Sequence, residues 1–321
     1  MEYLALFLTL LFIELLYFKV AKKFNIIDKP NLRSSHEHLT LRGGGIIFYI
    51  AAASQFITSE FEFPWFFIGL TSMAVISFVD DVVSLSNKIR IFVHFAAVIL
   101  IAVQLHVFSM PWYYIVIGFV VVVGVINAYN FMDGINGMTA CYSLSVGALL
   151  LLVNYEVNFI ESNFIIYPLI GVMVFAIFNF RTIAKTFAGD VGSVSIAFIL
   201  MFCFAKLILK TGDYIYILFL TLYGLDTVWT IIRRFTLGES IFEAHRSHLY
   251  QYLGNEVGCS KLLISFLYAV LQFGIGLLVI WISQFDFSVQ IVFSVVLLSV
   301  LSVVYLILKR MIIRKYIFKV L

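Results

Sequence analysis

The chain has 321 residues, of which 63% are hydrophobic and only 12% are charged, and its mean hydropathy is +1.06. A soluble domain carries roughly a quarter charged residues, so too few charges are present here to cover a water-facing surface. The same composition excludes a disordered chain, a coiled coil, a disulfide scaffold and a DNA-binding module. The three cysteines, Cys141, Cys203 and Cys259, have no metal-ligand spacing. We therefore expect a protein that crosses a membrane several times.

Apolar segments long enough to cross a membrane recur along the whole chain. A bilayer core of roughly 30 Å needs about 20 apolar residues in a helix. On that length the sequence predicts an all-α fold with about eleven spans, at residues 3–20, 43–59, 65–79, 91–108, 112–126, 139–153, 163–178, 193–210, 214–231, 262–283 and 288–308. Glu14 interrupts the first segment and no small-residue cleavage site follows, so we expect a span there rather than a signal peptide. No repeat or linker divides the chain, which favours a single domain over residues 1–321.

The basic residues predict the orientation. Nineteen of the 21 Lys and Arg residues fall in the loop 19–42, in three later loops or in the C-terminal tail, and Lys206 and Lys210 are the exceptions. An odd number of spans places all of these loops on one side, and basic loops stay in the cytoplasm. We therefore expect the N-terminus outside and the C-terminus in the cytoplasm.

Two polar clusters lie before the second span and after the third. The first reads Arg33-Ser34-Ser35-His36 and then Arg42-Gly43-Gly44-Gly45. Such glycines at a helix start can present N–H groups to a phosphate. A basic segment that anchors the chain at the membrane and contains a flexible turn would show the same sequence pattern. The second cluster is the pair Asp80-Asp81, followed by Lys88 and Arg90. Adjacent acids at the hydrocarbon edge are tolerable when a divalent cation or a shared proton lies between them. A solvated helix C-terminus would disfavour acids, so the pair indicates a functional site rather than a plain helix end.

A third cluster, after the fifth span, carries no compensating base. Asn127, Asn130 and Asp133 recur every three residues, so on a helix they would form one polar stripe. Gly134 then precedes Asn136, and glycine allows a tight turn or a close ligand. An unpaired acid with amides between apolar spans indicates a functional site.

The last two clusters follow the seventh and ninth spans. One is Gly189-Asp190-Val191-Gly192-Ser193, in which Asp190 could also be a plain helix N-cap. The other runs from Asp226 through Arg233-Arg234 to Glu243-Ala244-His245-Arg246-Ser247-His248. Two histidines make a weak zinc site, so phosphate binding by Arg246 and His248 fits better. Together the clusters suggest magnesium-dependent phosphoryl transfer between a soluble donor and a lipid phosphate.

In this order the motifs resemble those of the polyprenyl-phosphate N-acetylhexosamine-1-phosphate transferases, which belong to glycosyltransferase family 4. The resemblance runs from the first span to His248 and is nearest to the O-antigen-initiating branch. It implies that N-acetylhexosamine 1-phosphate, either of GlcNAc or of a 6-deoxy sugar, moves from a UDP-sugar to undecaprenyl phosphate with release of UMP. It also implies a place in the bacterial inner membrane, Mg²⁺ with Mn²⁺ as a substitute, and no nucleic-acid partner. The oligomeric state stays open, with a homodimer as the assembly considered.

The resemblance also implies roles for individual residues. Asp190 and Asp133 would bind the metal, and Asp80 or Asp81 would deprotonate or orient the lipid phosphate. Asp133 and His248 would also be catalytic, and substrate contacts would come from Arg42, Asn127, Asn130, Gly134, Asn136, His245 and Arg246, with Arg246 and His248 clamping phosphate or sugar. Since adjacent helical residues point about 100° apart, we expect Asp80 and Asp81 to differ, with Asp80 as the base because it lies nearer the hydrocarbon.

Two positions depart from the family pattern. Asn136 stands where many relatives carry Asp, so it can offer only a carbonyl to a uracil N–H. In the last loop His245 replaces an Asp, and Tyr250 and Gln251 replace histidines, which leaves His248 as the one imidazole in register.

Two other classes of membrane protein fit the motifs less well. A CDP-alcohol phosphatidyltransferase should read Asp-Gly-x-x-Ala-Arg, but Asp133-Gly134 is followed by Ile-Asn-Gly-Met. A transporter would place ionisable residues near the bilayer midplane, whereas these carboxylates lie at one face.

Overall fold

The computed structural model describes residues 1–30, 35, 38–83, 85–240 and 245–317, with the backbone alone at residue 87. The long helices are α1 (Glu2–Lys23), α2 (Ile46–Thr58), α3 (Pro64–Val82), α4 (Asn87–Gln104), α5 (Trp112–Met132), α6 (Met138–Val157), α7 (Ser162–Asn179), α8 (Gly189–Thr211), α9 (Thr221–Thr236), α11 (Lys261–Ile282) and α12 (Phe287–Ile312). Shorter elements are η1 (Val107–Ser109), η2 (Tyr214–Leu220), α10 (Leu249–Gln251), η3 (Tyr252–Glu256) and η4 (Ile313–Ile317). The strands β1 (Ile27–Asp28) and β2 (Thr40–Leu41) form one antiparallel pair.

The all-α prediction is confirmed, and the protein is a multi-pass membrane protein. Within the described part of the chain, nine helical segments are long and apolar enough to cross a membrane. The two remaining expected spans coincide with α4 and with α2, an apolar helix of 13 residues. At about 1.5 Å per residue, α2 is shorter than the hydrocarbon core.

Several helix boundaries differ from the expected spans by a few residues, and two of these differences have a local reason. The expected span 91–108 ends earlier, at Gln104, because His106 adopts a left-handed φ of 54°. The span expected to end at residue 126 continues to Met132. Asn127 does not interrupt that helix, because its side chain donates back to the Val123 carbonyl oxygen over 2.8 Å.

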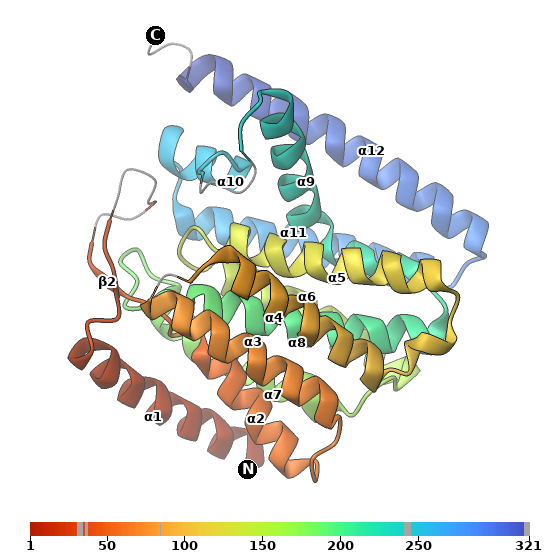
Figure 1. The fold of residues 1–321 in the computed structure, drawn as a ribbon. Coiled ribbons are helices and arrows are strands. Elements are labelled where there is room, and N and C mark those ends of the chain that lie inside the picture. Colours follow the sequence, from red (N-terminus) through yellow and green to blue (C-terminus); the bar gives the residue numbers. More distant parts are fainter. Residues whose placement is uncertain (31–34, 36–37, 84, 241–244, 318–321) are drawn as a thin grey trace.

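The most buried and the most exposed of the long helices are α8 and α12. Every residue of α8 from Val191 to Phe204 is buried, as expected for a helix that is apolar all round. Phe66 of α3 packs on Phe202 of α8 with ring centroids 4.4 Å apart. By contrast α12 runs along the outer edge of the bundle in Figure 1 and exposes a continuous apolar surface. In a membrane that surface faces lipid.

The segments that carry the polar clusters meet at one end of the bundle. Leu41 of β2 pairs in parallel with Thr186, just before α8. The N–H groups of Gly44 and Gly45 then donate to the carbonyls of Phe187 and Ala188, over 2.9 and 3.1 Å. The expectation that these glycines present N–H groups to a phosphate is therefore wrong for both, because protein carbonyls already bind them. The glycines instead let the start of α2 approach α8, where a Cβ on Gly45 would overlap Gly192.

Candidate active site

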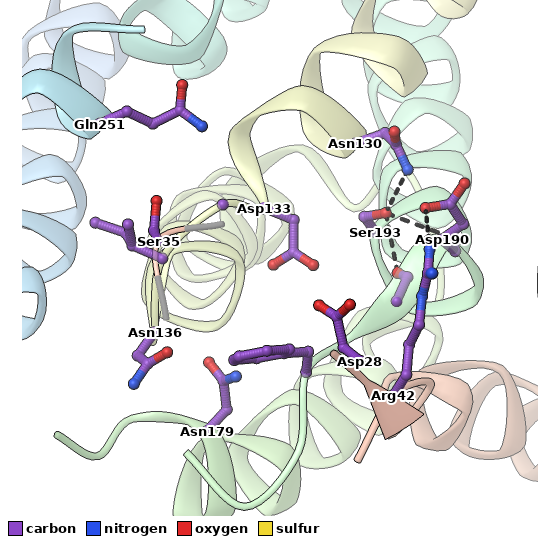
Figure 2. Close-up of a pocket in the computed structure, with 14 residues that line it drawn as sticks. Asp28, Ser35, Arg42, Asn130, Asp133, Asn136, Asn179, Asp190, Ser193 and Gln251 are labelled. Atoms are coloured by element: carbon purple, nitrogen blue, oxygen red, sulfur yellow. Dashed lines mark hydrogen bonds and ion pairs between the residues drawn. The ribbon is translucent and has the colours of Figure 1, made fainter. Parts of the chain in front are cut away.

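A polar cavity of about 260 Å³ opens at this end of the bundle. Its walls come from β1, the loop before α2, the end of α5, the loop after it, the end of α7, the start of α8 and α10. The lining residues are Asp28, Ser35, Arg42, Asn130, Asp133, Gly134, Ile135, Asn136, Asn179, Phe187, Gly189, Asp190, Ser193 and Gln251. Figure 2 shows Arg42 and Asp190 on one side and Gln251 on the opposite side, with Asp28 and Asp133 between them. Carboxylates, amides and an arginine thus face one space.

Two arginines connect the acids around the start of α8. Arg42 pairs with Asp81 at 2.7 Å and approaches Asp190 at 3.6 Å. Arg90 pairs with Asp80 at 2.8 Å and with Asp190 at 2.9 Å. Arg90, which follows the acid pair in the sequence, thus pairs with Asp80, and Asp81 pairs with Arg42 instead. Asp190 lies between both guanidinium groups, so a phosphate approaching it would also meet two cations.

Asp80 and Asp81 occupy different environments, as the sequence predicts. The Asp81 carboxylate is fully buried and accepts the N–H groups of Asp190 and Val191, over 3.0 and 3.1 Å. The Asp80 side chain is 10% exposed and accepts the N–H of Leu85 at 2.7 Å. The reason given for choosing Asp80, that it is the more desolvated acid, is wrong, because Asp81 is the buried one.

Asp190 is not the N-cap of α8. The N-cap residue is Ala188, and the capping acceptor is Asp81, which reaches the helix start from α3. Gly189 has a left-handed φ of +69°, and a Cβ there would overlap the Asp81 carboxylate. The Asp190 carboxylate is therefore not used for capping and lies at the cavity.

The polar stripe at the end of α5 divides in two. Asn130 lines the cavity and donates to Ser193 Oγ at 3.2 Å. Asp133 follows the helix end and accepts from the Thr139 hydroxyl at 2.6 Å. Burial raises the pKa of Asp133 well above the usual range of a carboxyl group. Asn127 is bound to its own helix and does not line the cavity, so two of the three residues reach the candidate site.

Asn136 and Asn179 hold the loops that form the cavity floor. The Asn136 amide donates to the carbonyl oxygens of Arg181 and Thr182, at 2.7 and 3.1 Å. Asn179 accepts the N–H of Gly137 at 2.7 Å. The backbone oxygen of Asn136 accepts from the Ser265 hydroxyl at 2.9 Å, whereas for its side-chain Oδ1 no hydrogen-bond partner is found among the described residues, so Oδ1 is available to accept from a ligand.

The structure places the three candidate residues of the last loop outside the cavity lining. His248 is 1% exposed, and its Nδ1 lies 3.3 Å from Asp226. Arg246 pairs with Glu256 at 3.0 Å. His245 approaches Ser247 at 3.0 Å, and burial lowers the pKa of its ring. Of this loop, Gln251 is the residue that lines the cavity, with Gly134 packed under the neighbouring Tyr250.

Some residues were missed by sequence reasoning, and others lie outside the described residues. Asp28, Asn179 and Gln251 line the cavity but were not named as candidates. Asp28 directly precedes a Lys-Pro pair, and Asn179 precedes an arginine in a loop beside a membrane, so polar residues at span ends were the available signal. The motif residues Arg33, Ser34, His36, Glu243 and Ala244 are not among the described residues.

The residues around the cavity fit a hard cation. Carboxylates of Asp28, Asp133 and Asp190 and the side chain of Asn130 line it, and no thiol or imidazole is found among its described lining residues. Magnesium usually binds one or two carboxylates and completes its shell with water and phosphate. Accordingly, no ready-made cage of three His, Cys, Asp or Glu side chains exists within the ranges that the structure describes. Asp133, half-buried at the cavity and accepting from the Thr139 hydroxyl, is a group that a cation would stabilise.

Comparison with known proteins agrees with the resemblance that the sequence motifs carry. The family model for glycosyl transferase family 4 matches residues 63–208. The chain is similar to a probable undecaprenyl-phosphate N-acetylglucosaminyl 1-phosphate transferase of Bacillus subtilis, with 26% identity over 92% of this chain and 90% of the relative. It is also similar to the undecaprenyl-phosphate alpha-N-acetylglucosaminyl 1-phosphate transferases of Yersinia pestis, with 27% identity over 73% of this chain and 71% of the relative, and of Escherichia coli K12, with 26% identity over the same shares. The match to this family model and the similarity to these relatives agree with the family that the sequence motifs indicate.

Proposed function

We propose that this protein transfers N-acetylglucosamine 1-phosphate from UDP-N-acetylglucosamine to undecaprenyl phosphate and releases UMP. The main support is the combination of relatives of that named activity along nearly the whole chain with a cavity of acids, amides and an arginine at the membrane edge. The reaction would supply the first lipid-linked sugar of a cell-surface glycan.

The proposed reaction exchanges one phosphoric anhydride for another. An oxygen of the lipid phosphate forms a bond to the phosphorus that carries the sugar. The bond from that phosphorus to the bridging oxygen breaks, and this oxygen leaves with UMP. Such transfer needs mainly positioning and charge stabilisation from the protein. Arg42, whose side chain is 34% exposed at the cavity, is suited to bind a phosphate by two hydrogen bonds.

Asp190 and Asp133 would hold a magnesium ion, with Asp28 as a further candidate ligand beside them. A bound magnesium ion would offset the negative charge of the donor diphosphate. Neighbouring side chains hold these residues in place. Arg90 holds Asp190 at 2.9 Å, Thr139 holds Asp133 at 2.6 Å, and Asn130 is fixed against Ser193.

Asp80 is the better candidate for a direct role toward the lipid phosphate. Its carboxylate is partly exposed and lies at the end of α3, next to the exposed apolar residues Val82 and Val83. Asp81 is fully buried and holds both Arg42 and the start of α8. The proposed division is that Asp80 orients or deprotonates the acceptor, whereas Asp81 builds the site.

The nucleoside would lie toward the loop after α5. The side-chain Oδ1 of Asn136 can accept from the uracil N–H, although it carries no charge. A second cavity of about 370 Å³ shares Ser35, Asn136 and Phe187 with the first, so the combined space accommodates more than a diphosphate.

The proposed orientation places this end of the bundle in the cytoplasm and the protein in the bacterial inner membrane. Its support is the 19 basic residues on that side. A reporter fused to the C-terminus should read cytoplasmic, and an external reading would overturn the assignment. A homodimer stays a prediction.

The proposed function is tested with purified protein, undecaprenyl phosphate, magnesium and a panel of UDP-sugars labelled in the sugar. UDP-N-acetylglucosamine should give solvent-extractable lipid label together with UMP, and UDP-glucose should give none. Asn127→Ala is the matched active control, because Asn127 lies on the same helix as Asn130 but outside the cavity. Absence of lipid label with every donor would refute the proposal, and label from a 6-deoxy donor alone would change the sugar.

A further inference from the structure

Asp226 of α9 is a buried acid that the proposed reaction does not use. It is 1% exposed, does not line the cavity and lies beyond the stretch 63–208 matched by the family model. Burying a carboxylate is costly unless hydrogen bonds and opposite charge stabilise it. Both are present, and they come from two different directions.

On one side Asp226 receives the short turn that begins at His248. Its carboxylate accepts the N–H groups of Leu249 and Tyr250, over 3.0 and 3.4 Å, and lies 3.3 Å from His248 Nδ1. Since a carboxylate only accepts, the imidazole must carry its proton on Nδ1 to make this bond. That leaves Nε2 as the second polar atom of the ring, buried and without a partner among the described residues.

On the other side the acid is held by α11 and α12. The hydroxyls of Tyr268 and Tyr305 donate to it, over 3.0 and 2.9 Å. Lys309, 3% exposed, donates to Tyr305 at 2.6 Å and to Thr230 at 2.7 Å. The last helix, which adds nothing to the cavity lining, therefore brings a buried cation to Asp226.

The turn itself packs against the cavity wall. Tyr250 donates to the Phe131 carbonyl oxygen at 2.9 Å and covers Gly134, where a Cβ would overlap its hydroxyl. Gln251 lines the cavity, and its carbonyl accepts the N–H of His248 at 3.2 Å. Its amide nitrogen is thereby left to donate, and Figure 2 shows this side chain pointing into the cavity from the side opposite Arg42.

We propose that Asp226 is a positioning residue of the transferase reaction. With Tyr305 and Lys309 it fixes the His248 turn, so that the Gln251 amide faces the donor sugar or its phosphate and the His248 ring keeps its Nε2 unprotonated in the neutral form. The inference rests on the proposed function, because it assigns Asp226 an effect on that reaction.

The test compares Asp226→Asn with the wild type. Asparagine keeps the shape of the side chain but lacks the negative charge that faces Lys309. Its NH₂ group cannot accept hydrogen bonds, so the side chain cannot accept both from the His248 turn and from the tyrosine hydroxyls. We expect kcat to fall about 10- to 100-fold, as when outer partners that orient a functional side chain are lost. Binding of UMP by calorimetry should stay within about twofold, because the Arg42 side of the cavity makes no contact with Asp226. Hydrogen exchange at the amides of Leu249 and Tyr250 should become faster.

A double-mutant cycle separates positioning from general stability. Asp226→Asn should add little to the loss already caused by the pair His248→Ala and Gln251→Ala, since it acts through those side chains. Ser302→Ala is the matched control, because Ser302 accepts from Trp229 at 3.0 Å across the same contact between α9 and α12. This variant should keep wild-type kcat. Tyr305→Phe, a milder change, should lower kcat in the same direction.

The outcomes keep the two proposals apart. If the wild type makes no lipid-linked product, the proposed function fails, and wild-type exchange at Leu249 and Tyr250 in Asp226→Asn would also overturn the positioning role. If the wild type is active, wild-type kcat in Asp226→Asn overturns the positioning role alone. Loss of UMP binding together with kcat, or additive losses in the cycle, would show a purely structural residue. Should Asp226→Asn not fold, Tyr305→Phe carries the same comparison against Ser302→Ala.

Discussion

The two sides of the cavity use buried acids in different ways. At the start of α8, Asp81 and Asp190 face Arg42, which lines the cavity, and Asp190 also pairs with Arg90, whose side chain is 27% exposed. Around Asp226 the acid is enclosed by tyrosine hydroxyls, a lysine and backbone N–H groups, away from the cavity. The first arrangement leaves charge where a phosphate can meet it, whereas the second uses charge to hold a turn. Burial of an acid alone therefore does not indicate its role: Asp81 and Asp226 are both buried, but of the two only Asp81 contacts a residue, Arg42, that is found in the described lining of the cavity.

Asp190→Asn should have the largest effect, because Asp190 is the acid most directly between the two arginines and the cavity. We expect turnover to fall on the order of 10²–10³-fold or more, as when a preorganised charge is removed from an active site. The measurement is UMP release at saturating substrates, with thermal unfolding as a check of folding. Turnover within a few-fold of wild type would remove Asp190 from the metal site and break the comparison.

Removing divalent metal should be nearly as severe. The cavity offers carboxylate and amide oxygens, which suit magnesium or manganese rather than soft metals. Activity should vanish in excess EDTA and return with magnesium, and zinc should not restore it. Full turnover in EDTA would leave the acids of the cavity without their proposed ligand.

Variants of Asp80 and Asp81 should show which acid has a structural role and which has a direct role in the reaction. Asp81→Asn leaves Arg42 without its buried partner and weakens the cap of α8, so we expect a loss of about 2 kcal/mol in stability and a lower Tm. Asp80→Asn should keep the wild-type Tm while kcat falls more than about tenfold, the equivalent of 1.4 kcal/mol in transition-state binding. Equal shifts in Tm for both variants would contradict this division.

The smallest contrast lies within α5. Asn130→Ala removes an amide that lines the cavity, and turnover should fall about tenfold, because hydrogen bonds to charged groups contribute roughly 1.5–3 kcal/mol. Asn127→Ala removes only a bond to the helix itself and should leave turnover within about twofold of wild type. The two variants are measured side by side, and equal losses would mean that the whole stripe serves the site.

The sequence predicted the parts of this structure that depend on local composition. Apolar length located the spans, and unusual residue types at their ends located Arg42, Asn130, Asp133 and Asp190 at the cavity. What the sequence does not display is the partner of each group. The N–H groups of Gly44 and Gly45 were expected to be open, but Phe187 and Ala188, each 143 residues later in the chain, supply their acceptors.

Other parts could not be predicted because they depend on long-range packing. Lys309 and Asp226 lie far apart in the chain, and only the packing of α12 on α9 joins them through Thr230 and Tyr305. His248 was expected at the substrate because imidazole is a common ligand group, yet the fold turns its Nδ1 to Asp226. Gln251 was treated as a lost histidine, although it is the residue of that loop that reaches the cavity.

In the proposed reaction the sugar moves together with its phosphate, and labelling both groups of the donor measures this. UDP-N-acetylglucosamine is labelled with ³²P in the phosphate that carries the sugar and with ³H in the sugar, and it is incubated with the protein, undecaprenyl phosphate and magnesium. If sugar 1-phosphate is transferred, both labels should enter the lipid in equal molar amounts, and the released nucleotide should be unlabelled UMP. Tritium in the lipid with ³²P retained in released UDP would show transfer of the sugar alone and would contradict the account.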